Sequence, residues 1–127
     1  MPRHGDITVL CPYYHRAVEL IGRRWSGAIL RVLLDGAERF GDIAAAIPGL
    51  TDRMLSERLK ELEAEGIVTR TVIPETPVRI EYHLTPKGHS LAPVLDVVGD
   101  WARTWLAEPD TPVARSYGEA AARVRPR

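Results

Sequence analysis

Hydrophobic side chains recur at helical spacing in the first third of the chain and predict two helices. The first opens at Cys11-Pro12, because proline is tolerated at the first helical position, and it ends at Gly22. The second begins at Trp25 or Ser26, with Ser26 as its expected cap, and ends at Asp35. Their apolar stripes are Tyr14, Val18 and Ile21 in the first helix and Ile29, Leu30, Leu33 and Leu34 in the second.

Two further helices follow, with a tight turn between them. Arg39–Ile47 predicts a short third helix, and Pro48-Gly49 forces the chain to turn after it. Thr51 is placed to cap a fourth helix, which runs to about Glu65 and stops at Gly66. The third helix buries Phe40, Ile43 and Ile47, and the fourth aligns Leu55, Leu59 and Leu62 on one face, with Arg58 on its flank.

Two strands complete this region. Ile67–Ile73 is rich in β-branched residues, and Arg79–Leu84 alternates between apolar and polar side chains, with Pro74–Val78 as the connecting loop. Helix, turn, helix and hairpin in this order are typical of a winged helix-turn-helix, which is mostly α with a small β-hairpin. That fold lays one helix in the major groove of double-stranded DNA.

The C-terminal part predicts a long helix with an unusually wide apolar face. It starts after Thr85-Pro86 and continues to about Leu106, and Pro93 is expected to bend it. Its apolar surface exceeds what one small domain covers, so we expect a homodimer that packs through its N- and C-terminal helices. The expected interface residues are Tyr14, Val18, Leu91, Leu95, Val98, Trp101 and Trp105.

Composition limits the remaining possibilities. The 127 residues fit one domain at 11–106, with a flexible arm at 1–10 and a linker and tail at 107–127. The formal net charge is zero, so DNA affinity must come from local placement of Arg and Lys. We expect no membrane association, because no apolar run reaches spanning length and the first residues lack a signal peptide. The single cysteine indicates a reducing, cytoplasmic setting.

The outward face of the fourth helix carries polar side chains that suit base recognition. Arg53 could fork onto guanine, Ser56 could hydrogen-bond a base edge or a phosphate, and Glu57 could accept from cytosine. The full predicted set on this helix is Thr51, Asp52, Arg53, Ser56, Glu57 and Lys60. The competing interpretation is a solvated face without a ligand, which the acidic residues favour.

The wing and the start of the third helix add further candidates. Arg79 and Thr76 could reach the minor groove or the backbone beside it, and Arg70 could hold a phosphate or pair with Glu81. Arg39 could bind a phosphate at a helix N-terminus, or form a surface ion pair with Asp42.

Cys11 is a candidate reactive thiol. At a helix N-cap the positive end of the dipole favours a thiolate, and His15 and Arg16 could assist. The alternative is a small buried hydrophobic residue. Without a second cysteine, oxidation would produce an intersubunit disulfide, a mixed disulfide or an adduct.

Most of the chain, from about Cys11 to Trp105, resembles a known family. The matching motifs are Cys11-Pro12, Ile21-Gly22-Arg23-Arg24-Trp25, Ile29-Leu30-Arg31, Arg39-Phe40, Ile47-Pro48-Gly49-Leu50-Thr51, Met54-Leu55-Ser56, Arg58-Leu59-Lys60-Glu61-Leu62-Glu63, Gly66-Ile67-Val68 and Tyr82-His83-Leu84-Thr85-Pro86-Lys87-Gly88. Together they resemble the HxlR-type winged helix-turn-helix regulators, relatives of the MarR group, over most of the chain. The family commonly has Gly-Lys-Trp where this chain has Arg23-Arg24-Trp25.

That resemblance implies a bacterial homodimer that binds pseudo-palindromic operator DNA, often as a repressor. Some members respond to oxidants or electrophiles through a cysteine near the N-terminus, which gives Cys11 a possible sensing role. A small aromatic effector could alternatively bind between the long helices, where Tyr13, Tyr14, Trp101 and Trp105 are the candidate lining.

Other classes of function find little support in the residues. His4, His15, His83 and His89 are scattered, so we expect no metal site and no cofactor. The hydroxyl residues have no partnered histidine and acid, and no glycine-rich phosphate loop follows a strand, so we expect no enzyme. The alternative to a DNA-binding regulator is a winged helix used only for protein–protein contact.

Overall fold

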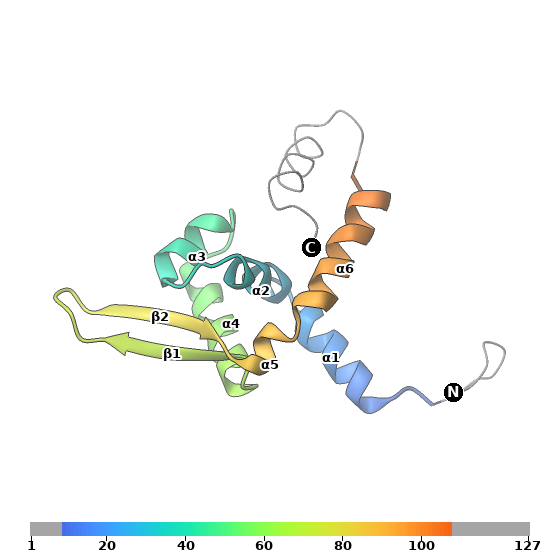
Figure 1. Cartoon of the computed structure of the whole chain (residues 1–127), viewed down its shortest axis with the longest axis horizontal. Coiled ribbons are helices and arrows are strands. Elements are labelled where there is room, and N and C mark those ends of the chain that lie inside the picture. The colour runs from blue at the N-terminus through green and yellow to red at the C-terminus, as the bar shows by residue number, and fades with distance from the viewer. Residues whose placement is uncertain (1–8, 108–127) are drawn as a thin grey trace. The chain divides into compact units, whose positions relative to one another are not determined.

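The computed structural model describes residues 9–107 and contains six helices and two strands within that range (Figure 1). In chain order they are α1 (Pro12–Gly22), α2 (Ser26–Leu34), α3 (Phe40–Ala46), α4 (Asp52–Ala64), β1 (Val68–Ile73), β2 (Arg79–Leu84), α5 (Pro86–His89) and α6 (Ala92–Trp105). The order confirms the mostly helical winged helix-turn-helix prediction. Nearly all of the predicted arm and tail lies outside the described residues. The chain divides between His89 and Ser90 into two compact units.

The core of the first unit comes from the apolar stripes of its helices. Its completely buried side chains are Ile29, Leu30, Ile43, Leu55, Leu59, Leu62, Ile67 and Val68. Burying each one contributes about 1.5–3 kcal/mol, so these residues hold α2, α3, α4 and β1 in one body. Phe40, which we expected in the core, is only half-buried.

The start of α2 differs from the prediction. Trp25 is the N-cap and adopts a left-handed backbone with φ of 77°, whereas Ser26 is the first helical residue and is buried. The prediction of Ser26 as cap was wrong, because the chain turns one residue earlier, at a left-handed conformation that sequence preference disfavours for tryptophan. A side chain added at Gly49 would lie 3.6 Å from the Trp25 ring, so Trp25 lies against the α3–α4 turn.

The hairpin forms an extended wing beside the helices (Figure 1). Its antiparallel register runs from Val68 opposite Leu84 to Ile73 opposite Arg79. The wing is anchored at its base, where buried Tyr82 donates its backbone N–H to the Glu38 carbonyl at 2.7 Å. Only the loop end of the wing is therefore free to reach outward.

The predicted long helix after Thr85 is broken into two. Thr85 Oγ1 accepts the Gly88 N–H at 3.1 Å and caps the short α5, which ends at His89, and α6 begins at Ala92. The expected bend at Pro93 is a full interruption, because proline has no N–H and its ring clashes with the carbonyl four residues earlier. No helix among residues 9–107 has the length and apolar character needed to cross a bilayer.

Candidate nucleic-acid interface

Helix α4 divides its side chains between the core and one outward polar face. Leu55, Leu59 and Leu62 are buried and hold the helix in the first unit. The six residues predicted to face DNA are all exposed except the half-buried Ser56: Thr51, Asp52, Arg53, Ser56, Glu57 and Lys60. The helix therefore presents hydrogen-bonding groups outward from its first turns, where recognition helices contact bases.

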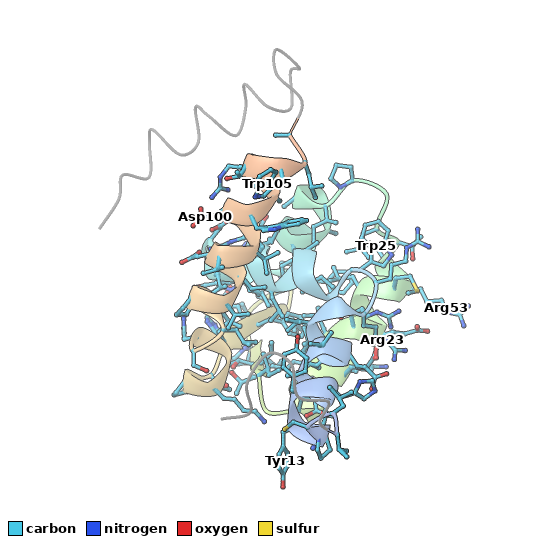
Figure 2. All side chains as sticks on the ribbon, turned by 90° about the vertical axis from the view of Figure 1, so that its right-hand side faces the viewer. Tyr13, Arg23, Trp25, Arg53, Asp100 and Trp105 are labelled. Atoms are coloured by element: carbon cyan, nitrogen blue, oxygen red, sulfur yellow. The ribbon has the colours of Figure 1, made fainter. Side chains whose placement is uncertain are left out.

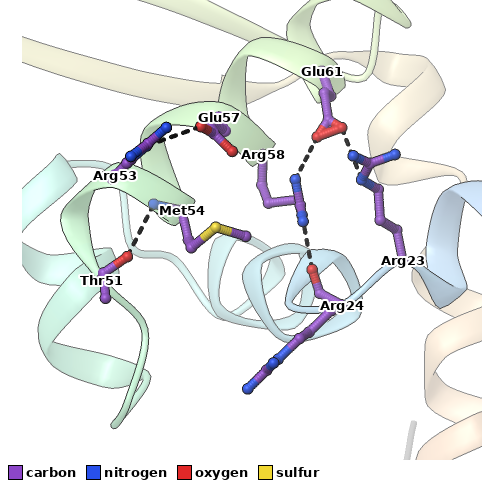
Figure 3. Close-up of polar contacts among 8 residues, drawn as sticks. All are labelled: Arg23, Arg24, Thr51, Arg53, Met54, Glu57, Arg58 and Glu61. Carbon is purple, nitrogen blue, oxygen red and sulfur yellow. Dashed lines mark hydrogen bonds and ion pairs between the residues drawn. The ribbon is translucent and has the colours of Figure 1, made fainter.

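Thr51 caps this helix, as the sequence predicts. Its Oγ1 accepts the Met54 N–H at 3.1 Å (Figure 3). The cap satisfies one of the free N–H groups at the helix start and fixes where the polar face begins.

Arg53 is an exposed cation of this face. Its side chain is 88% exposed, and Nε lies 3.3 Å from Glu57 Oε1, one turn along the helix (Figure 3). Figure 2 shows Arg53 extending away from the ribbon. An exposed pair of this kind contributes little to stability, so the guanidinium can leave Glu57 for a stronger acceptor.

The wing holds Arg79 more tightly than expected. Its side chain lies between two carboxylates, with Nη2 3.4 Å from Glu75 Oε1 and Nε 2.9 Å from Glu81 Oε2. The second contact is close but not aligned as a hydrogen bond. Arg79 would have to leave both partners to reach DNA, whereas Thr76 in the loop is exposed.

Arg70 and Arg39 are both exposed. Arg70 lies opposite Tyr82 in the register, and Thr71 lies opposite Glu81, so the Arg70–Glu81 pair does not form within residues 9–107. Arg39 is the N-cap of α3, and it makes no ion pair with Asp42 in this part of the chain. A surface hollow of about 550 Å³ lies between the start of α3 and the wing. It is lined by Arg39, Phe40, Gly41 and residues 75–80.

Sequence reasoning missed a polar cluster at the base of the wing. His83 Nε2 lies 3.0 Å from Glu81 Oε1, and Nδ1 lies 3.8 Å from Glu38 Oε1. The hydrogen bond from His83 lowers the pKa of the Glu81 carboxyl, with further lowering by the charges of Arg79 and Arg39 and opposition from burial. The cluster has ligand atoms within 4.8 Å of one another, but the same two arginines disfavour a cation there.

The burial of Arg58 was also not predicted. Arg58 lies on the flank of α4, as expected, but its side chain is only 8% exposed. Nε donates to the Arg24 carbonyl at 2.8 Å and Nη1 to Glu61 Oε1 at 2.7 Å, while Arg23 Nε lies 3.0 Å from Glu61 Oε2 (Figure 3). The flank position is buried because the α1–α2 connection, 34 residues away in sequence, covers it.

Cys11 is the N-cap of α1, and it is exposed, so the alternative of a buried hydrophobic residue was wrong. The two neighbouring side chains that were expected to assist Cys11 pair with carboxylates instead. His15 lies 3.0 Å from Glu19, and Arg16 lies 2.9 Å from Glu65.

The residues expected at a dimer interface differ in exposure. On α1, Tyr14 and Val18 are exposed. In the second unit, Val98, Trp101 and Trp105 are exposed, Leu91 is half-buried and Leu95 is buried. Large apolar side chains on the surface of α1 and of α6 are features of association surfaces.

Comparisons with known proteins agree with this geometry. The HxlR-like helix-turn-helix family matches residues 20–110. The HTH-type transcriptional regulator YvaP of Bacillus subtilis is 55% identical over 97 residues, covering 76% of this chain and 90% of YvaP. The reduced form of the transcriptional regulator YodB from B. subtilis is 46% identical with a TM-score of 0.69, over 81% of this chain and all of that one.

The redox regulator HypR in its oxidised form is 35% identical with a TM-score of 0.71, over 77% of this chain and all of that one. YodB has also been solved after diamide treatment and with a quinone bound. Motifs, fold and relatives agree: the chain belongs to the HxlR-like helix-turn-helix family and is a transcriptional regulator of that type.

Proposed function

We propose that the protein is a homodimeric repressor that binds a pseudo-palindromic operator. The outward polar face of α4, capped at Thr51 and standing clear of the leucine core, carries this proposal. Family membership supports DNA as the ligand of that face. Two copies related by a two-fold axis would place their recognition helices in successive major grooves, about 34 Å apart. Repression follows from occupying a promoter.

Dimerisation would cover apolar surface that is costly to leave in water. Tyr14, Val18, Val98, Trp101 and Trp105 are exposed and form the proposed interface together with Leu91. Leu95 is buried, so it adds no exposed surface to this interface.

Titration of labelled DNA with the protein at several salt concentrations tests DNA binding. We expect selection from a genomic DNA pool to yield a palindromic site, bound with an affinity that falls steeply with salt, because each neutralised phosphate releases counterions. A winged helix used only for protein contact would select no sequence and show no such salt dependence.

We further propose that Cys11 makes the repressor responsive to oxidants or electrophiles. Its exposed position at the α1 N-cap supports this role, as do relatives solved in oxidised, diamide-treated and quinone-bound forms. Two Cys11 thiols from two chains would form one disulfide, and the two electrons and two protons released would reduce diamide. A quinone would instead form a carbon–sulfur bond with the thiolate. Its two oxygens would then be protonated, one by water and one by the hydrogen released from the attacked ring carbon, to give a hydroquinone thioether.

A thermal-shift screen distinguishes covalent modification of Cys11 from reversible binding of an aromatic effector. A covalent response requires Cys11 and survives dialysis. A shift that Cys11→Ser retains would instead indicate a non-covalent ligand site.

A further inference from the structure

Charged side chains connect helix α1 to the recognition helix. Helix α1 contributes no fully buried side chain. Among its contacts with the α4 region are the Arg16–Glu65 ion pair, in which Nη2 lies 2.9 Å and 3.2 Å from the two carboxylate oxygens, and the contact of Arg23, at its C-terminal cap, with Glu61. Glu61 and Glu65, the C-cap residue of α4, lie one turn apart on the same side of the helix.

Arg58, on α4, also contributes to this connection. Its guanidinium is buried and reaches two partners at once, the Arg24 carbonyl and Glu61. Glu61 therefore joins two arginines, one from α4 itself and one from the α1–α2 connection (Figure 3). We call Arg23, Arg58 and Glu61, with the Arg24 carbonyl, the polar seam.

Burying a guanidinium between two segments has a desolvation cost, because the charge loses its contact with water. Apolar residues of similar volume often stabilise a fold equally well or better, so a buried ion pair is weak support for a purely stabilising role. An arginine instead provides defined geometry, because the N–H donors of its planar guanidinium fix the angle between the groups that they bind. The seam is therefore suited to setting the orientation of α4 against the α1–α2 connection.

We propose that Arg58 and Glu61 are positioning residues for DNA recognition, which set the orientation of the α4 face without touching DNA. This inference rests on the proposed function, because α1 also carries Tyr14 and Val18 of the proposed dimer interface. A seam between α1 and α4 then fixes the separation of the two recognition helices in the dimer, and that separation must match the groove repeat.

Two substitutions that remove the same charge test the proposal, because electrostatics alone and the polar seam predict different effects on DNA binding. Glu61→Gln and Glu63→Gln each remove one negative charge from α4, two residues apart, and Glu63 is exposed. Electrostatics alone predicts that both changes strengthen binding to phosphates. The seam predicts that Glu61→Gln weakens operator binding by about 3- to 30-fold, whereas Glu63→Gln binds as tightly as wild type or more tightly.

Arg58→Met provides a second variant that keeps the volume of the side chain. We expect it to fold and to lose operator affinity at every salt concentration with an unchanged slope, because no phosphate contact is lost. Arg58→Lys should not restore affinity, since an ammonium cannot make the forked contact. Leu62→Val, a core change one residue from Glu61, controls for general destabilisation and should leave the affinity of the folded protein unchanged.

Amide hydrogen exchange tests the seam without DNA. In Arg58→Met and Glu61→Gln, exchange should rise at residues 23–27 and not in β1. Unchanged exchange there would overturn the seam, and raised exchange with unaltered operator affinity would overturn its role in DNA positioning. Absence of operator binding by the wild type would refute the proposed function itself, and the positioning role with it, whatever the exchange result.

Discussion

Replacement of Arg53 by alanine tests the proposed reading face most directly among single substitutions. The folded protein should lose almost nothing. Arg53 is 88% exposed, and its 3.3 Å contact with Glu57 is a surface i,i+4 pair, which contributes about 0.3–0.5 kcal/mol. A bidentate contact to guanine is larger, so operator binding should weaken by about 1–3 kcal/mol, or about 5- to 150-fold.

The assay is fluorescence anisotropy with the selected operator and with variants at each base pair. Loss of a base contact should relax preference at one position in each half-site, whereas loss of a phosphate contact should weaken all sequences equally and reduce the salt slope. Glu57 is itself a candidate base contact, so Glu57→Ala is measured both alone and together with Arg53→Ala. This double-mutant cycle separates the loss of the Arg53 contact from the repulsion of a carboxylate left without its partner.

Arg31, whose side chain is 42% exposed, offers a control for the loss of an i,i+4 pair. It forms an i,i+4 pair with Asp35 at the same 3.3 Å on α2. Arg31→Ala should leave operator affinity within about twofold of wild type, since surface changes away from a site have small effects. An unchanged isotherm for Arg53→Ala at all salt concentrations would remove Arg53 from the site. Equal losses in both variants would attribute the effect to overall charge.

Four other outcomes are expected. Thr51→Ala should lower the free energy of unfolding by about 0.5–2 kcal/mol, measured by urea denaturation, because the α4 cap is lost; no change would show that Met54 N–H is satisfied otherwise. Cys11→Ser should bind the operator like the reduced wild type and ignore diamide, and a wild type indifferent to diamide would refute the thiol sensor. Trp101→Glu should yield monomers in analytical ultracentrifugation, and an intact dimer would place the interface elsewhere. Glu81→Gln should be less stable than wild type at pH 7, because the lowered pKa of Glu81 stabilises the fold above the ordinary carboxyl pKa. That difference should shrink as the pH falls below the ordinary carboxyl pKa and Glu81 becomes protonated, and a difference that does not shrink with falling pH would assign the loss to packing.

The elements of the DNA-binding region could be predicted because local signals agree there. Thr51, the leucine repeat and Gly66 each mark α4, and the register of β2 follows from its alternation. The exposure of the α4 polar face followed from the same helical repeat, since the residues opposite the leucines had to lie outside.

What could not be predicted depends on contacts distant in sequence or on backbone conformation. Arg58 is at a flank position on a helical wheel, and its side chain is buried where it bonds the Arg24 carbonyl, 34 residues away in sequence. The break before α6 was underestimated because the apolar stripe continues through it, although Pro93 marked the place. The contact of His83 with Glu38 joins two elements that sequence patterns treat separately.

Footprinting of the wild-type protein on its selected operator is the measurement closest to the central claim, that paired α4 faces read DNA. The proposal predicts two protected half-sites on one side of the duplex, with centres about one helical turn apart and major-groove contacts at each. Arg53→Ala should lose protection in both. A single protected patch, or protection that ignores sequence, would contradict the account.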